Sequence, residues 1–449
     1  MKCIHDAFLN ILRAALCAAE PADPCLTESQ WDQLFRLASE QDVLPLIYDR
    51  ARFCLSLSDL LEKSRSMRIW RERAVSSAAF QIIRTDEFLM LLDKARDQGM
   101  DAAVLKGIVC RDLYPVPALR PSVDEDLLIK PQEMGSWHRF FVEEGLSCDQ
   151  DSSDSQDSED ALLMEEDELS YHRSDSPIYI ELHKCLFDPK SEIFGDLNFL
   201  FDNLQTESVE ICGVIRTAEE VQMHTIRTLT PTDHLLFLIL HAFKHFLYSG
   251  VGVRTICDIG MFSEKYGDRI DWEHICSGLE SVHALFFAKA LYRIIQLYLM
   301  PESQFDASVV AGDEIDVEPL LTDILDSGVH GDSSLVRLHS SNMTLSAVEA
   351  HRGGMQDKDE PSDRVETGSS RRPRAGILRS AFPPLKSMRT RYPYLKKAPF
   401  LLPVAWVQRI AHYLKETRAS GSGSAVSESA QSIRLGRERV ELLKKYHII

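Results

Sequence analysis

The sequence predicts a mixed α/β (α+β) protein in which a small mixed sheet is flanked by N-terminal and C-terminal helical regions. Two observations support this prediction. Apolar side chains recur at helical spacing through residues 1–98 and again through residues 217–300. Between these regions, short apolar or alternating runs end at glycine or proline, which is typical of strands joined by turns.

Residues 1–98 are predicted to be helical. Thr27 is a candidate N-cap for an amphipathic helix whose apolar face includes Trp31. A short apolar turn of helix follows at residues 43–48. Residues 69–98 contain little glycine and no turn cluster, so we expect one or two longer helices there.

The core with the strands is predicted at residues 99–216. Its strands are expected at residues 102–105, 122–130, 177–185 and 209–215. In the third of these runs apolar and polar side chains alternate, with Glu181 and His183 on the polar face. A helix is expected at residues 132–144. The ten carboxylates of residues 149–168 are interpreted as a solvated, mobile insertion.

Helices are expected to resume after the core. Residues 217–300 are predicted to form a helical region that packs on it. Residues 301–375 lose periodicity and are interpreted as a disordered linker with a short helix near residues 317–325. Residues 376–449 form a basic segment that ends in a helix at residues 433–446.

The charge is unevenly distributed along the chain. The 50 Lys and Arg residues against 69 Asp and Glu residues give a net charge of −19. From Arg371 onward there are 17 basic and 4 acidic residues, which is +13, so the preceding part carries −32. This acidic body makes nucleic acid an improbable partner, because affinity for phosphate backbones needs cationic surface. We interpret the basic segment as packing against the acidic body, with contact to nucleic acid or to an anionic membrane surface as alternatives.

Cysteine usage and hydropathy indicate the compartment. The ten cysteines are scattered singly without a C-x-x-C pair, and the first residues do not form an uninterrupted secretory core. No stretch reaches the roughly 18 apolar residues that a membrane-spanning helix needs. We therefore expect a cytoplasmic protein with reduced thiols and no transmembrane segment.

Three carboxylates are candidates for a metal site. Asp124 and Asp126 are two residues apart on the second expected strand and project to the same face, and Glu181 lies on the polar face of the third. If these strands pair, like charges converge and require a compensating cation. We therefore predict that the three carboxylates are catalytic and bind Mg²⁺, with two ions serving phosphate chemistry.

A glycine turn precedes these carboxylates. Lys106 and Gly107 end the first expected strand and open a helix, where backbone N–H groups can approach phosphate oxygens. Lys106, Arg120 and Ser122 supply further hydrogen-bond donors. The sequence therefore predicts a nucleotide-binding site that includes these four residues.

The helix expected at residues 231–248 carries a polar stripe opposite its apolar side. Lys244, at the border of the stripe, is predicted to bind the triphosphate, with a solvated lysine as the alternative. His234, His241 and His245 could share a metal ion, because histidines four residues apart lie on one face. No H-E-x-x-H pattern is present, so we interpret them as a polar face that lines a cleft.

Taken together, these motifs resemble a known family. The segment VLKGIVCRDLYPVPALRPSVDEDLLI is similar to the signature of the uncharacterised nucleotidyltransferase family in the DNA polymerase β-like nucleotidyltransferase superfamily. The segments IELHKCL and HAFKHF…GVGVRTICDIGMF resemble its third-acid strand and following helices, so the resemblance spans residues 5–300, with a weaker one at residues 385–410. It implies a nucleotidyltransferase core in which the three carboxylates bind metal, and Lys106 and Gly107 line the phosphates.

The resemblance implies a reaction and leaves alternatives. The expected activity is transfer of a nucleoside monophosphate from an NTP, ATP in the first place, to a hydroxyl of a small molecule, sugar or protein side chain, with Mg²⁺-assisted attack on the α-phosphate and release of pyrophosphate. Glu125 stands where the family usually has an apolar residue, and Ile108 where the superfamily has serine or glycine. The alternative is a catalytically inactive nucleotide-binding or scaffold protein with the same fold. A third hypothesis is an interaction protein whose carboxylates pair with lysines.

Overall fold

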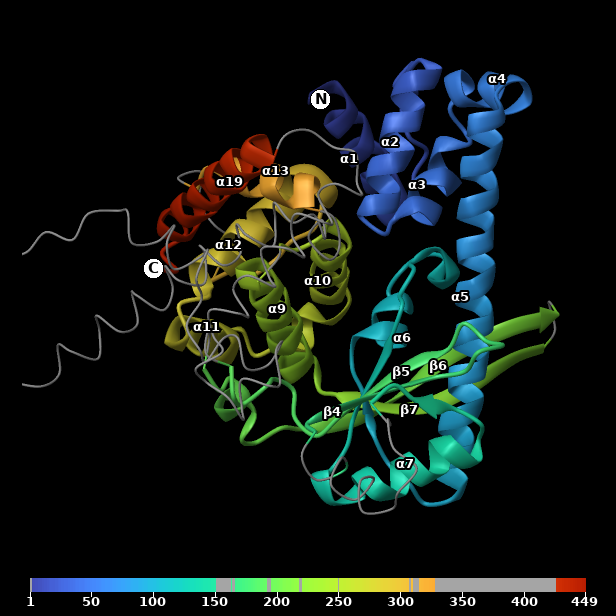
Figure 1. The fold of residues 1–449 in the computed structure, drawn as a ribbon, viewed down its shortest axis with the longest axis vertical. Helices are drawn as coiled ribbons and strands as arrows, with labels where there is room; N and C mark the ends of the chain where they lie inside the picture. Colours follow the sequence, from blue (N-terminus) through green and yellow to red (C-terminus); the bar gives the residue numbers. More distant parts are fainter. Residues whose placement is uncertain are drawn as a thin grey trace, which may run out of the picture. The chain divides into compact units, whose positions relative to one another are not determined.

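The computed structural model describes residues 2–150, 163, 166–191, 195–217, 220–248, 250–306, 308–309, 315–327 and 425–449. The chain forms two compact units, and each is considered by itself. The first contains the elements from α1 to α13 in Figure 1, and the second contains helix α19 (Ala425–Lys445). Most of the acidic run, most of the expected linker and the basic segment before residue 425 lie outside the described residues.

The N-terminal part of the first unit is helical. Its helices are α1 (Lys2–Leu16), α2 (Glu28–Glu40), α3 (Leu44–Ala51), α4 (Leu55–Lys63) and α5 (Arg65–Asp97). The residues expected to form one or two long helices lie in the single helix α5, which begins where the Ser64 hydroxyl accepts a hydrogen bond from the Met67 N–H at 3.2 Å. In Figure 1, α5 runs from the other N-terminal helices to the sheet, so it connects these two parts of the unit.

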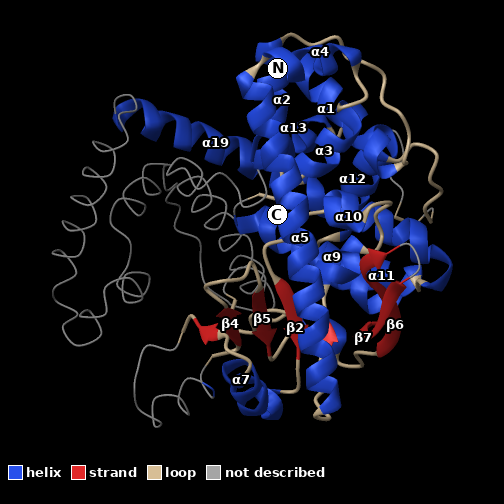
Figure 2. Ribbon diagram, turned by 90° about the vertical axis from the view of Figure 1, so that its right-hand side faces the viewer, coloured by secondary structure: helices blue, strands red, loops and turns tan. Residues whose placement is uncertain are grey.

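Seven strands among the described residues of this unit form one mixed sheet. The strands are β1 (Ala103–Val104), β2 (Glu125–Leu128), β3 (Ser147–Cys148), β4 (Glu168–His172), β5 (Tyr179–His183), β6 (Thr206–Thr217) and β7 (Glu220–Leu229). Their order across the sheet is β3-β4-β5-β2-β1-β7-β6, and Figure 2 labels β4, β5, β2, β7 and β6 from left to right in this order. β2 pairs in parallel with β5, and β1 with β7, while the other neighbours are antiparallel. The mixed α/β fold class predicted from the sequence is therefore confirmed.

Three strands were not predicted. β3 and β4 flank the acidic run, and β7 extends the sheet past residue 216, where we expected the core to end. The buried residues of β7 include His224 and Thr228, which are 3% and 2% exposed. Because these buried side chains are polar, the strand lacks the alternation of apolar and polar residues on which the prediction depended.

The predicted alternation in β5 sets its two faces. Ile180 and Leu182 are fully buried, whereas Glu181 and His183 on the opposite face are half-buried. On the neighbouring strand β4, Tyr171 packs against Phe141 of helix α7, with ring centroids 4.8 Å apart. The polar face of β5 is thereby left available for a site.

Helices and short turns complete the unit. They are α6 (Lys106–Arg111), η1 (Pro117–Leu119), η2 (Pro131–Glu133), α7 (Met134–Glu143), η3 (Asn198–Phe201), α9 (Pro231–Tyr248), α10 (Val253–Tyr266), η4 (Gly267–Arg269), α11 (Trp272–Ser281), α12 (Leu285–Ile294), the π-helical turn η5 (Ile295–Leu299) and α13 (Glu318–Ser327). The short helix expected near residues 317–325 corresponds to α13. Among the described helices, none combines the length and the apolar character needed to cross a membrane.

A buried glutamine joins three of these helices. Gln41, at the end of α2, is fully buried, and its amide donates to the carbonyl oxygens of Ile324 and Leu325 at 2.8 and 3.0 Å. Its side-chain oxygen accepts the N–H of Val253 at 2.8 Å. The amide therefore satisfies backbone groups at the end of α13 and at the start of α10, which fixes α10 against the N-terminal helices.

Candidate active site

A cavity of about 750 Å³ is lined by residues of β2, β5, α6, α9 and α10. All eight residues that the sequence predicted for catalysis or nucleotide binding lie on its wall, namely Lys106, Gly107, Arg120, Ser122, Asp124, Asp126, Glu181 and Lys244. They come from segments that are up to 138 residues apart, from 106 to 244. The fold therefore brings them around one space.

The parallel pairing of β2 with β5 sets the carboxylates beside each other. Asp126 is the register partner of Glu181, and such partners present their side chains on the same face of a sheet. Asp124 precedes β2 and lies two residues before Asp126, and it lines the same cavity. The two strands therefore pair as a shared carboxylate site requires.

His183 belongs to this cluster, although it was not among the residues predicted for the site. Its Nε2 atom lies 3.2 Å from Asp126 Oδ1 and 3.7 Å from Glu181 Oε2. One ligand atom from each of the three side chains falls within 4.8 Å of the others, and in the described part of the chain this is the one such group that could hold a metal ion. The signal was present, because His183 shares the polar face of β5 with Glu181 by the same two-residue spacing that joins Asp124 to Asp126.

The charges in this cluster are only partly balanced. Lys106 Nζ lies 3.0 Å from Asp126 Oδ1. Burial opposes the charge on Asp126, but Lys106 and His183 outweigh it and hold the pKa of this carboxyl well below its usual range. Burial, followed by the negative charges of Asp126 and Asp124, raises the pKa of Glu181 to about 7. The second oxygen of Asp126, Oδ2, is buried and has no hydrogen-bond partner among the described residues.

These features fit a bound cation. Buried polar atoms normally have partners, so Asp126 Oδ2 is an oxygen available to a ligand. The raised pKa of Glu181 indicates that the cluster holds more negative charge than Lys106 neutralises. Carboxylate oxygens that converge in this way are suitable ligands for a divalent metal ion.

Glu181→Gln is expected to stabilise the metal-free protein at alkaline pH. The pKa of Glu181 in the fold, about 7, exceeds the value of about 4.3 in an unfolded chain, so its charge costs folding free energy above pH 7 and costs nothing below about pH 4. In EDTA at pH 8 we expect the free energy of unfolding in urea to rise by about 2 kcal/mol, and the gain to shrink as the pH falls and to vanish only at about pH 4. Equal stability of wild type and variant at pH 8 would contradict this. Glu143→Gln, at an exposed position on α7, is the control.

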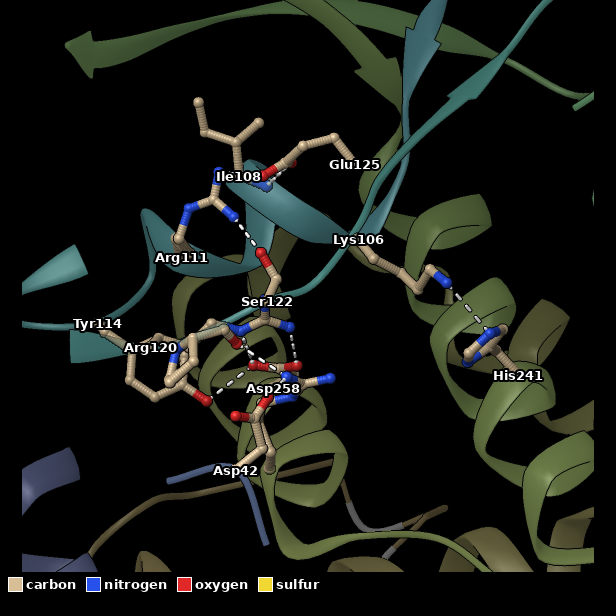
Figure 3. A network of polar contacts seen from close by, with 12 residues as sticks. Asp42, Lys106, Ile108, Arg111, Tyr114, Arg120, Ser122, Glu125, His241 and Asp258 are labelled. Carbon is tan, nitrogen blue, oxygen red and sulfur yellow. Dashed lines mark hydrogen bonds and ion pairs between the residues drawn. The ribbon is translucent and has the colours of Figure 1, made fainter. Parts of the chain in front are cut away.

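The glycine turn is occupied by an internal carboxylate. Gly107 has φ +31°, and a Cβ atom there would lie 2.1 Å from Glu125 Oε2. The same oxygen accepts the backbone N–H of Ile108 at 3.0 Å. The cationic partner that Glu125 needs is Arg111, 2.5 Å away on α6, and both side chains are buried (Figure 3). At this turn the N–H of Ile108 is therefore directed at Glu125 and away from the cavity ligand that the sequence predicted.

Gly107→Ala is expected to destabilise the protein more than Gly99→Ala does. Both glycines have positive φ, but Gly99 has open space around the added methyl group, whereas Gly107 would place it against Glu125. We expect thermal unfolding to show an additional loss of about 1–3 kcal/mol for Gly107→Ala. Equal losses for the two variants would show that the carboxylate can move aside.

Arg120 and Ser122 are engaged by internal partners. Arg120 is buried and donates through Nε and Nη2 to the carboxylate of Asp258 at 3.1 and 2.5 Å, and Tyr114 donates to the same carboxylate at 2.7 Å. The Ser122 hydroxyl accepts from Arg111 at 2.5 Å. Figure 3 shows Tyr114 and Arg120 meeting at Asp258, and Arg111 reaching Ser122. The described contacts of both residues therefore hold this loop in place.

Helix α9 contributes a different set of side chains. Lys244 lines the cavity together with His241 and His245, whose Nε2 atoms are 3.3 Å apart. His241 Nε2 lies 3.2 Å from Lys106 Nζ, and burial together with the charge of Lys106 holds the pKa of His241 well below its usual range. His234 differs from the expectation, because it is fully buried against Thr228 and does not line the cavity.

Comparisons with known proteins point to one family. No match is found among curated proteins or among solved structures. The model of a family described as uncharacterised nucleotidyltransferase matches residues 27–299, which is more than half of the chain and includes the whole cavity wall described above. The chain therefore belongs to the uncharacterised nucleotidyltransferase family.

Proposed function

We propose that this protein transfers a nucleoside monophosphate from an NTP, ATP in the first place, to a hydroxyl group of an acceptor, and releases pyrophosphate. The register that pairs Asp126 with Glu181, with Lys106 in contact with Asp126, is the observation that carries the proposal. It supplies oxygens for a cation and an ammonium group for phosphate at neighbouring points of one cavity.

Asp124, Asp126 and Glu181 would hold divalent ions, with Mg²⁺ as the ion that carboxylate oxygens favour. A bound ion of this kind would neutralise phosphate oxygens and increase the electrophilicity of the α-phosphorus. The unpartnered Asp126 Oδ2 and the excess negative charge around Glu181 support this assignment.

The residues of the cavity have separate roles in the reaction. Lys106, and Lys244 from α9, would bind the β- and γ-phosphates and stabilise the charge that develops on pyrophosphate. An acceptor hydroxyl attacks the α-phosphorus, a new P–O bond forms, the bond to the pyrophosphate oxygen breaks, and the hydroxyl proton is released beside Glu181. The many carboxylates around the cavity favour a small molecule, sugar or protein side chain over nucleic acid as acceptor.

The proposal is tested with the full-length protein and the four NTPs, each labelled at the α-phosphate. Transfer of the label to each member of a panel of hydroxyl acceptors is measured with MgCl₂, with MnCl₂ and with EDTA, and pyrophosphate release is measured in parallel by a coupled phosphate assay. The control is the double variant Asp126→Asn/Glu181→Gln. Release that needs a divalent ion and is lost in the double variant is the expected result. NTP binding without release, or no binding at all, would overturn the proposal, the first outcome in favour of an inactive nucleotide-binding protein.

A further inference from the structure

We propose that His183 is itself a metal ligand, so that Asp126, Glu181 and His183 form a mixed oxygen–nitrogen site that binds Mn²⁺ and related transition-metal ions more tightly than Mg²⁺. This deepens the proposed function, since it names the class of ion at one of the two expected positions. The site itself rests on contacts that do not depend on NTP chemistry.

The position of His183 on β5 directs its imidazole into the acidic cluster. Nε2 is the atom that faces Asp126 and Glu181, at 3.2 and 3.7 Å from their nearest oxygens. The His183 side chain is 15% exposed and lines the cavity, so an ion can reach it. A nitrogen and two carboxylates from adjacent strands thus meet at one point, within the 4.8 Å that one ion can bridge.

Glu168 faces the second ring nitrogen of His183. Its Oε2 lies 3.4 Å from His183 Nδ1, and in the register of β4 with β5 these two residues are directly opposite each other. Histidines that bind metals typically direct their second ring nitrogen at a carboxylate or carbonyl group, which places the proton there and leaves the first nitrogen free to coordinate. With an ion bound at Nε2, Glu168 would therefore face the remaining N–H at Nδ1 and hold the ring in place.

Asp126 provides the independent observation. It is 2% exposed, and Oδ2 has no hydrogen-bond partner among the described residues, although Oδ1 is in contact with both Lys106 and His183. A buried carboxylate oxygen without a partner is costly unless a ligand occupies it. An ion at this cluster would supply the partner that the Asp126 carboxylate lacks, while Lys106 keeps its contact with Oδ1.

The Nε2 atom of His183 determines which class of metal ion the site prefers. Mg²⁺ prefers oxygen ligands in a regular octahedron, whereas imidazole is a good ligand for transition-metal ions. Replacing one oxygen by the Nε2 of His183 weakens Mg²⁺ binding relative to Mn²⁺. Asp124, which supplies oxygen alone, would serve the second position, where Mg²⁺ remains suitable.

The test is direct metal binding to the full-length protein without NTP. Calorimetric titration of metal-free wild type is expected to give a Kd for Mn²⁺ at least about 10-fold lower than that for Mg²⁺. His183→Asp, which replaces nitrogen with oxygen, should bring the two values together. Glu168→Gln should weaken Mn²⁺ binding by about 10-fold. Electron spin-echo modulation of bound Mn²⁺ should show coupling to a ¹⁴N nucleus in wild type and lose it in His183→Asp.

A control variant shows whether a change in metal affinity is specific to His183. His172→Asp changes a histidine of β4 whose side chain is 42% exposed and lies outside the cavity wall, and it should leave both Kd values unchanged. Equal Kd values for the two ions in wild type, or an unchanged ratio and ¹⁴N signal in His183→Asp, would overturn the proposal. Mn²⁺ binding with the ¹⁴N signal but no pyrophosphate release would retain this site and reject the transferase function.

Discussion

Asp126→Asn is expected to reduce nucleotidyl transfer by at least about 1,000-fold, which corresponds to about 4 kcal/mol of transition-state stabilisation. Asp126 lies at the centre of the cluster, in contact with Lys106 and His183 and in register with Glu181. An amide of the same shape cannot supply the negative charge on which both the cation and Lys106 depend. Initial rates of pyrophosphate release at saturating NTP measure the loss.

The control for this variant is Asp112→Asn. Asp112 follows α6 directly and pairs with Lys265 at 3.0 Å, but it does not line the cavity. It should keep full activity, so a similar loss in both variants would indicate a general effect of lowering the charge. More than a tenth of the wild-type rate in Asp126→Asn would show that this carboxylate is not essential to the reaction.

The folded fraction of Asp126→Asn also has to be measured. In the fold the pKa of Asp126 is depressed below its unfolded value, so its charge contributes stability that is present above pH 4 and lost as pH falls. The neutral amide removes this contribution at neutral pH. We therefore expect a lower midpoint of thermal unfolding by circular dichroism, and rates should be compared at a temperature where both proteins are folded.

The orientation of side chains could be predicted from the sequence where apolar and polar residues alternate along a strand and the apolar ones are buried. In β5, apolar residues are buried and polar ones face the cavity, so Glu181 could be assigned to a face from its neighbours alone. The same rule could have selected His183. The rule could not predict strand β7, because the buried face of this strand includes His224 and Thr228. These two polar side chains form hydrogen bonds with Asp93 and Val104, which lie far away in the sequence. Such partners are invisible to a local pattern.

The environment of Glu125 illustrates the same limit. A carboxylate among apolar strand residues predicts either solvent or a cationic partner, and the structure gives it Arg111, 14 positions earlier in the chain, as well as the N–H of Ile108. Similarly, Arg120 and Ser122 have side chains suited to phosphate, but Asp258 and Arg111 are their observed partners. Side-chain chemistry was therefore predictable for these residues, and the choice of partner depended on the tertiary structure.

Breaking the buried pair of Arg111 and Glu125 is expected to have the largest effect on stability. Their charged atoms are 2.5 Å apart, and the side chains are 1% and 0% exposed. Burial raises the pKa of Glu125, although Arg111 opposes this, so the charged state of Glu125 depends on its partner. Removal of one member of such a pair leaves a buried charge without compensation, which costs about 3–5 kcal/mol. We expect losses of this size for Arg111→Met and for Glu125→Gln in urea unfolding.

The double variant Arg111→Met/Glu125→Gln distinguishes the free-energy cost of one unpaired buried charge from the net contribution of the ion pair to stability. The glutamine side chain introduced at position 125 would still accept the N–H of Ile108, and no ionised group of the pair would remain in the interior. Because a buried ion pair must overcome the desolvation of both partners, its replacement by neutral groups is often nearly neutral. We therefore expect the double variant to recover at least about 2 kcal/mol of the sum of the single losses. Strictly additive losses would mean that Arg111 acts through Ser122 and Glu125 acts through the N–H of Ile108, independently of each other and not as an ion pair.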